Sequence, residues 1–272
     1  MSKILYESAE ADALTASEKN EPWRYEAETL KAKLILEHGG DLASLLDIGC
    51  GWGQTLQELV GRIPILAGVD QSPDRIASLQ DNQKKIKTYL CRASSLTLKD
   101  DSFDAVLMSH ILHEILLFGD PGESEQTYSE VKRVLCKKGA FFIIDHRDPG
   151  EGSVTIDIGP HLETLETFRS RFQLREIDYQ RQDNLVEISK RDCHDFITKI
   201  WCLDQGAEDL EMNETHTVIN SERLAKDLES NGFAVEVNIP FNPITDLMDY
   251  YGIKLVKGDF WGRQIFVLAR SA

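Results

Sequence analysis

Short apolar segments alternate with amphipathic segments over the first 146 residues. We expect strands at 45–48, 65–69, 88–91, 103–109 and 140–145, and helices at 22–38, 54–60, 72–83 and 124–135. Two helix starts are marked locally, by Pro22 and by Ser72 as an N-cap followed by Pro73. Strands separated by helices at this spacing form βαβ units, so the sequence predicts an α/β fold with a mainly parallel sheet.

The alternation stops after the fifth strand and resumes late in the chain. Residues 148–215 contain no clear strand and combine a Gly/Pro loop at 148–160 with helical segments near 161–173 and 186–204. A helix at 221–230 and strands at 233–239 and 264–269 follow. We therefore expect one domain from residues 1–147 and 216–272 with a seven-stranded sheet. A mostly helical insertion at 148–215 would form a lid over the substrate.

A glycine-rich turn follows the first strand. Gly49, Gly51 and Gly53 occupy alternate positions before a helix, where small residues let a ligand approach the backbone. The spacing is G-x-G-x-G and differs from the G-x-G-x-x-G pattern of dinucleotide sites. Asp47, just ahead of the turn, disfavours a pyrophosphate and favours a cationic ligand.

A second acidic residue, Asp70, ends the second strand 19 residues after Gly51. A carboxylate at this position of an α/β sheet can accept both hydroxyls of a ribose. The combination of strand, glycine turn, helix, strand and aspartate predicts a doubly wound, Rossmann-like nucleotide site.

Four motifs in this order carry a family resemblance. LLDIGCGWG, GVDQSP, LKDDSFDAVLMSHILHEI and VKRVLCKKGAFFIID together resemble the class I S-adenosylmethionine-dependent methyltransferases over about residues 40–146. The resemblance implies S-adenosylmethionine as cofactor and methyl transfer as reaction, and it says little about the substrate.

The resemblance also implies roles for individual residues. Asp47, Gly49 and Gly51 would hold the methionine part of the cofactor, Asp70 the ribose and Gln71 the adenine, while Ser109 and His110 would lie beside the sulfonium. An N-terminal helix often covers the cofactor in such proteins. Arg24 and Tyr25 are therefore expected contacts, with Arg24 facing the cofactor carboxylate.

One position departs from the family pattern. Where relatives carry an acidic residue that accepts from the adenine amino group, this chain has Arg92, which cannot accept a hydrogen bond. Either Ser94 or Ser95 takes that role, or the backbone of Ala93 together with stacking holds the adenine.

Histidines follow the fourth and fifth strands, where ligands bind in parallel sheets. His113 and His146 are the candidate general bases, because histidine titrates near neutrality, and His110 would line the cofactor pocket. A metal site formed by these three histidines is an alternative interpretation. The carboxylates expected beside them are few, so the sequence assigns no metal.

Several later residues permit two interpretations. Glu211, Glu214 and His216 either close over the substrate or belong to an acidic surface loop. Trp201 and the aromatic residues of 240–262 either form the wall of a substrate pocket or cover the core of the insertion. Cys193–His194 fits a buried thiol on a helix better than a nucleophile or a metal ligand.

Composition limits the classes of partner that we expect for this chain. The net charge of −16 disfavours nucleic acid, and the five cysteines, without a CxxC pair, suggest neither a disulfide framework nor zinc. No apolar run suits a membrane span, and the acidic N-terminus does not resemble a signal peptide, so a cytoplasmic location and no membrane partner are expected.

The sequence thus favours a methyltransferase that acts on oxygen or nitrogen of a small metabolite. Two alternatives stay open. One is an enzyme of the same fold that catalyses a non-methylating reaction such as cyclisation, and the other is a non-catalytic regulatory subunit. The assembly is also open, with a homodimer among the options.

Overall fold

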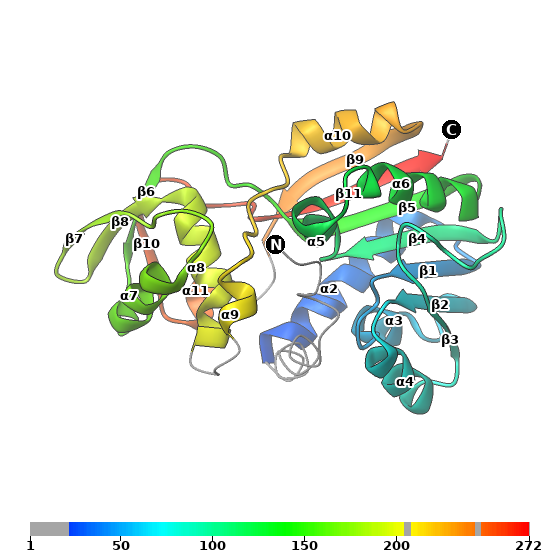
Figure 1. Cartoon of the computed structure of the whole chain (residues 1–272), viewed down its shortest axis with the longest axis horizontal. Coiled ribbons are helices and arrows are strands. Elements are labelled where there is room, and N and C mark those ends of the chain that lie inside the picture. Colours follow the sequence, from blue (N-terminus) through cyan, green and yellow to red (C-terminus); the bar gives the residue numbers. More distant parts are fainter. Residues whose placement is uncertain (1–21, 204–207, 243–245, 272) are drawn as a thin grey trace.

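A seven-stranded sheet forms the centre of the larger part of the molecule (Figure 1). The computed structural model describes residues 22–203, 208–242 and 246–271. The strands are β1 (Ser44–Ile48), β2 (Ile65–Asp70), β3 (Ile86–Leu90), β4 (Phe103–Ser109), β5 (Leu135–His146), β9 (Phe233–Phe241) and β11 (Gln264–Ser271). Their order is β3-β2-β1-β4-β5-β11-β9; β1 to β5 are parallel, and β11 is antiparallel to both β5 and β9. The predicted mainly parallel, seven-stranded sheet is confirmed.

Helices cover both faces of this sheet. The helices α2 (Pro22–Gly39), α3 (Gln54–Leu59) and α4 (Pro73–Asn82) pack on one face, and α5 (Leu112–Phe118), α6 (Glu123–Val134) and α10 (Ser221–Ser230) pack on the other. Strand β5 contributes to both cores, because Phe141 and Ile143 point to one face while Phe142 and Ile144 point to the other. Burial on both faces explains the continuous apolar run of β5. The helices on both faces make the sheet doubly wound.

The predicted helix start at Ser72 is confirmed by its hydrogen bond. The Ser72 hydroxyl accepts the backbone N–H of Arg75 at 3.3 Å, and Pro73 is the first residue of α4. Asn220 does the same for α10, because its Oδ1 accepts the N–H groups of Glu222 and Arg223.

A second, smaller sheet follows β5. It contains β6 (Ser153–Asp157), β7 (Tyr179–Gln182), β8 (Leu185–Ser189) and β10 (Lys254–Lys257), all antiparallel, in the order β10-β6-β8-β7. The helices α7 (Leu162–Arg171), α8 (Lys190–Leu203), α9 (Glu208–Glu211) and α11 (Leu247–Tyr250) lie beside it. This part has its own core, centred on side chains such as Phe168 and Phe196.

The expectation that residues 148–215 contain no strand is wrong. Three of the four strands of the second sheet lie in this segment. The strands β6 and β8 alternate buried and more exposed residues, but each has only five residues, and the four-residue β7 is exposed along most of its length, so the local signal is short. Their partner β10 comes from far along the chain, so the sheet depends on long-range pairing that local sequence does not reveal.

The second part lies beyond the carboxyl ends of β4 and β5 (Figure 1). The strand order reverses at β1, between β2 and β4, and ligands of open α/β sheets bind at such a point. The glycine turn after β1 therefore lies at the same edge of the main sheet as the smaller part.

Candidate active site

A cavity of about 640 Å³ lies at the carboxyl edge of the main sheet. Its wall includes α2, the glycine turn, the ends of β2, β4 and β5, and residues of α8 and of the segment 211–216. The volume falls within the roughly 300–1,000 Å³ typical of small-molecule sites. The cavity thus joins the expected cofactor residues to the smaller part.

The glycine turn is fixed to β2 by backbone hydrogen bonds. The N–H groups of Gly49 and Cys50 both donate to the carbonyl of Val69, at 2.8 and 2.9 Å. A Cβ at Gly49 would lie 2.8 Å from the Ile111 side chain, whereas one at Gly51 would meet no atom of the described residues within 4 Å. Gly49 is therefore required by packing, while Gly51 leaves open space at the cavity wall.

The two aspartates beside this turn differ in their partners. Asp70 accepts the N–H of Gly51 through Oδ2 and that of Ser72 through Oδ1, both at 2.9 Å. Asp47 is buried, and within the described part of the chain its Oδ1 has no hydrogen-bond partner. Burial and the nearby charge of Glu28 raise the pKa of Asp47 well above its ordinary value. A cationic group in the cavity would satisfy this carboxyl.

Helix α2 forms the adjacent wall. Arg24 lines the cavity and lies 3.4 Å from the carboxylate of Glu28, which also pairs with Lys31 at 2.8 Å. Tyr25 is not among the lining residues, and its side chain is 70% exposed. Of these two expected contacts, the structure brings only Arg24 to the cavity.

The expected adenine end contains a carboxylate that the sequence analysis missed. Glu123, at the start of α6, lines the cavity, and its Oε1 lies 3.6 Å from Nη2 of Arg92. Ala93 and Gln71 also line the cavity, whereas Ser94 does not; its hydroxyl donates to Glu123 instead. Glu123 lies 31 residues after Arg92, so only the packing of α6 reveals the pairing.

Ser109 and His110, at the end of β4, both lie on the cavity wall. His110 has a φ of 52°, which is rare for a residue other than glycine, and its N–H donates to the carbonyl of Ile144 at 2.8 Å. Burial lowers the pKa of His110 well below its ordinary value. Strained residues of this kind cluster at functional sites.

Both candidate bases line the cavity near the smaller part. Nδ1 of His113 lies 2.6 Å from Oδ1 of Asp145, and Nε2 lies 3.0 Å from Oε1 of Glu214. Burial opposes protonation of His113, but these two carboxylates outweigh it and raise its pKa well above the ordinary value. The ring of His146 stacks on that of His216, with centroids 4.1 Å apart and an interplanar angle of 4°.

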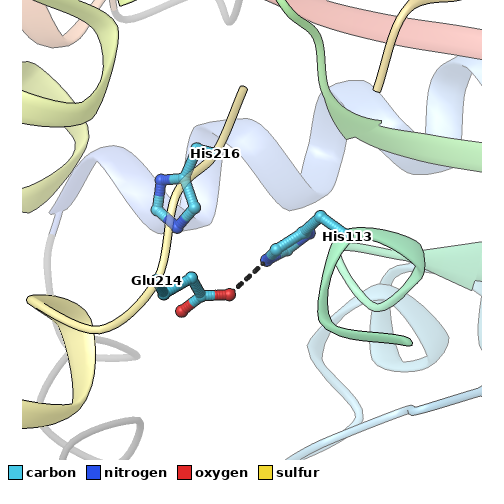
Figure 2. A group of neighbouring side chains, drawn as sticks. All are labelled: His113, Glu214 and His216. Carbon is cyan, nitrogen blue, oxygen red and sulfur yellow. Dashed lines mark ion pairs between the residues drawn. The ribbon is translucent and has the colours of Figure 1, made fainter. Parts of the chain in front are cut away.

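Glu211, Glu214 and His216 are all buried, so the surface-loop interpretation is wrong. Helix α8 holds their segment in place: Lys199 pairs with Glu211 at 2.8 Å, and Asp195 accepts the backbone N–H of His216 at 2.7 Å. Figure 2 shows Glu214 and His216 facing His113 from the opposite side. The histidine pattern after β4 and β5 gave no sign of these partners.

The aromatic residues do not all follow one of the two interpretations, which were a substrate-pocket wall and the core of the insertion. Trp201 lines the cavity and also packs in the core of the smaller part. Phe260 belongs to that core, while Tyr250 and Trp261 are exposed. Cys193 is fully buried in the same core on α8, which confirms the expected buried thiol on a helix, and burial raises its pKa to about 12.

Comparison with known proteins agrees with this geometry. Residues 46–143 match the model of a family described as a methyltransferase domain. The chain is 26% identical over 183 residues to the uncharacterized methyltransferase YcgJ of Bacillus subtilis (strain 168), covering 61% of this chain and 66% of that protein. It is 33% identical over 101 residues to the uncharacterized methyltransferase C70.08c of Schizosaccharomyces pombe (strain 972 / ATCC 24843), covering 36% and 37%.

The fold itself has solved counterparts. The structure of an S-adenosylmethionine-dependent methyltransferase from Mesorhizobium loti superposes with a TM-score of 0.54 at 18% identity, over 90% of this chain and 97% of that one. Among the described residues, no helix is long and apolar enough to cross a membrane.

Proposed function

Because the chain contains a class I S-adenosylmethionine-dependent methyltransferase domain, we propose that it transfers a methyl group to an oxygen or nitrogen of a small metabolite. The cofactor would supply the methyl group on a sulfonium. The continuity of the cavity is the observation that carries this proposal, because one space joins the glycine turn to the histidines and to Trp201.

The methionine end of the cofactor fits the residues after β1. The unpaired Oδ1 of Asp47 offers an acceptor for the amino group, and the open space at Gly51 admits a ligand against the backbone. Arg24 lies on the same wall and offers a donor for the carboxylate.

The nucleoside end fits the residues after β2 and at the start of α6. Each oxygen of Asp70 accepts one backbone N–H and keeps a further lone pair for a ribose hydroxyl. Gln71 and Ala93 would lie along the adenine. Glu123 supplies the acceptor that Arg92 cannot, so we assign the adenine amino group to this carboxylate.

The acceptor side would be formed by the smaller part. Residues 148–215, joined by β10 and α11, would close over the substrate, with Trp201 and Leu247 as apolar wall and with His113 and His146 toward the reacting group. The net charge of −16 disfavours a nucleic-acid substrate, which favours a small molecule.

Calorimetric titration with S-adenosylhomocysteine tests the cofactor site. We expect saturable binding at one site per chain, and Asp47→Asn should weaken it roughly 10- to 100-fold, since hydrogen bonds to charged groups contribute about 1.5–3 kcal/mol. Asp81→Asn, on the exposed side of α4, is the matched control and should bind normally. An unmodified chain that binds neither S-adenosylhomocysteine nor S-adenosylmethionine contradicts the proposal.

Product analysis separates the alternatives. A methyltransferase releases one S-adenosylhomocysteine for each acceptor converted, when presented with a panel of hydroxylated and aminated small molecules. Turnover of an acceptor without S-adenosylhomocysteine would indicate a cyclase-like reaction. A regulatory subunit would keep its function in an Asp70→Ala variant, whereas an enzyme would lose activity.

A further inference from the structure

Five of the seven histidines lie close together, and four of them line the cavity. They are His110, His113, His146, His194 and His216, which come from the ends of β4 and β5, from α5, from α8 and from the segment before α10. Their ring centroids form a chain of contacts between 4.1 and 5.5 Å. Of these five, the expected cofactor contacts include only His110, so the grouping of the other four histidines needs its own explanation.

Three side chains converge at its centre, as Figure 2 shows. His113, Glu214 and His216 each offer one ligand-type atom, and the three atoms lie within 4.8 Å of one another. All three residues are buried. Two ligand atoms of a tetrahedral Zn²⁺ lie roughly 3.4 Å apart, given bond lengths of about 2.0–2.1 Å. The 3.0 Å between Nε2 of His113 and Oε1 of Glu214 is close to this spacing, and small side-chain rotations would bring in the third atom.

The hydrogen bonds behind the two histidines fix which nitrogen faces the centre. The Thr198 hydroxyl donates its one proton to the carbonyl of His194 at 2.9 Å, so at 2.7 Å it accepts Nδ1–H of His216. Nε2 of His216 then carries the lone pair. Asp145 engages Nδ1 of His113 at 2.6 Å and turns Nε2 of that ring toward Glu214. A carboxylate or hydroxyl behind each ligating imidazole is the usual support of a metal-bound histidine.

The charges around the centre suit a cation. Asp145 and Glu214 flank His113, while the buried Lys199 is paired with Glu211. A divalent cation at the centre would lie between the carboxylates of Asp145 and Glu214.

A separate observation also indicates a ligand here. His194 is 1% exposed, and neither of its ring nitrogens has a hydrogen-bond partner among the residues that the structure describes. Nδ1 of His146 and Nδ1 of His110 likewise have none. Buried polar groups are almost always paired, so several unpaired imidazole nitrogens in one cluster imply a ligand that pairs with them directly or through bound water.

We propose that His113, Glu214 and His216 bind one divalent transition-metal ion, of the zinc class, with a coordination position open to the cavity. Two histidines and one carboxylate with an open position are the ligand set of catalytic zinc sites, and the same set binds non-haem Fe²⁺. The sequence pointed to a different trio, in which His110 and His146 joined His113. The carboxylate that completes the site lies about 100 residues further along the chain, at Glu214.

The position of the ion indicates the chemical class of the methyl acceptor. This inference rests on the proposed function. A metal ion on the cavity wall beyond Ser109 and His110 would bind a hydroxyl oxygen of the acceptor and lower its pKa. The oxygen would lose its proton to water and attack the methyl carbon. As the new carbon–oxygen bond forms, the carbon–sulfur bond breaks and its electron pair goes to sulfur. The acceptor is therefore a hydroxyl compound that can ligate a metal, and the product is its methyl ether.

Metal titration of the full chain tests the site without cofactor or acceptor. The chelator-treated protein is titrated with Zn²⁺ in a calorimeter and with Co²⁺ in a visible spectrometer. We expect one ion per chain and a tetrahedral-type cobalt spectrum. Glu214→Gln should weaken Zn²⁺ binding by more than the roughly 10–100-fold that is typical when only a residue orienting a ligand is changed. His38→Gln, outside the cluster, is the matched control and should bind normally.

A second variant covers the case in which loss of a ligand unfolds the chain. His216→Cys keeps a metal ligand and should add a sulfur-to-cobalt charge-transfer band. Absence of stoichiometric Zn²⁺ binding, unchanged affinity in Glu214→Gln, or a His216→Cys spectrum without the new band would each overturn the proposal. Titration with S-adenosylhomocysteine on the same samples reports the cofactor site separately, so failure of one proposal is distinguishable from failure of the other.

Discussion

Asp145 holds His113 through its side chain and through the start of α5 at the same time. Its Oδ1 lies 2.6 Å from Nδ1 of the imidazole, and its Oδ2 accepts the backbone N–H groups of Leu112 and His113 at 3.0 and 3.3 Å. Asp145 is fully buried at the end of β5, so the main sheet itself positions the histidine. The ring then lies on the cavity wall with its Nε2 toward Glu214.

Asp145→Asn should therefore slow methyl transfer without weakening the binding of the cofactor. The amide still offers an oxygen to the backbone of α5, but it can no longer fix the tautomer of His113. We expect the rate constant to fall roughly 10- to 100-fold, as for residues that orient a ligand or a base. Single-turnover kinetics and calorimetric titration with S-adenosylhomocysteine measure the two effects. An equal loss of rate and cofactor affinity would indicate a general structural defect instead.

The two glycines of the turn should respond differently to alanine. Gly51→Ala places a methyl group, at a φ of 53°, where no atom of residues 22–203, 208–242 or 246–271 lies within 4 Å. We expect a stability loss of about 1–2 kcal/mol from backbone strain and a much larger loss of cofactor affinity. Gly40→Ala, at a φ of 74° with equally open surroundings, is the matched control and should lose only stability. Normal cofactor binding by Gly51→Ala would contradict the cofactor site.

The ion pair between Lys199 and Glu211 should contribute strongly to the stability of the smaller part. Lys199 is fully buried, with its Nζ 2.8 Å from Oε2 of Glu211. Lys199→Met leaves a buried carboxylate without this partner and should cost roughly 3–5 kcal/mol in the free energy of unfolding. Lys33→Met, which removes the exposed pair with Glu37, should cost under about 1 kcal/mol. Denaturant unfolding measures both, and equal losses would contradict the prediction.

Stability in acid should depend on Glu28. Burial raises its pKa, but Lys31 and Arg24 outweigh burial, so the folded-state pKa lies below the ordinary value of 4.5. The contribution of Glu28 is therefore fully present above the unfolded pKa and is lost as pH falls through the folded one.

Glu28→Gln should lower the free energy of unfolding most near neutral pH, and its difference from the unmodified chain should shrink below about pH 4.5. Urea unfolding between neutral pH and pH 3.5 measures this convergence. Glu26→Gln, exposed on the same helix, should give a curve parallel to that of the unmodified chain. A difference for Glu28→Gln that grows in acid would contradict the assignment.

Local sequence determined the main sheet and the cofactor end. The G-x-G-x-G turn, Asp47 and Asp70 lie close together in the chain, and one βαβ unit brings them to one edge of the sheet. Backbone geometry and strand burial dictate that arrangement, so a pattern of residues suffices to predict it.

Only the tertiary structure decided the rest. Glu123 reaches Arg92 because α6 packs back along the sheet, and the antiparallel pairing of β6 with β10 joins segments about 100 residues apart. His113, Glu214 and His216 meet because the segment before α10, held by α8, closes over the carboxyl ends of β4 and β5. Contacts of this kind depend on how separate elements pack, and no periodicity or spacing within one element encodes them.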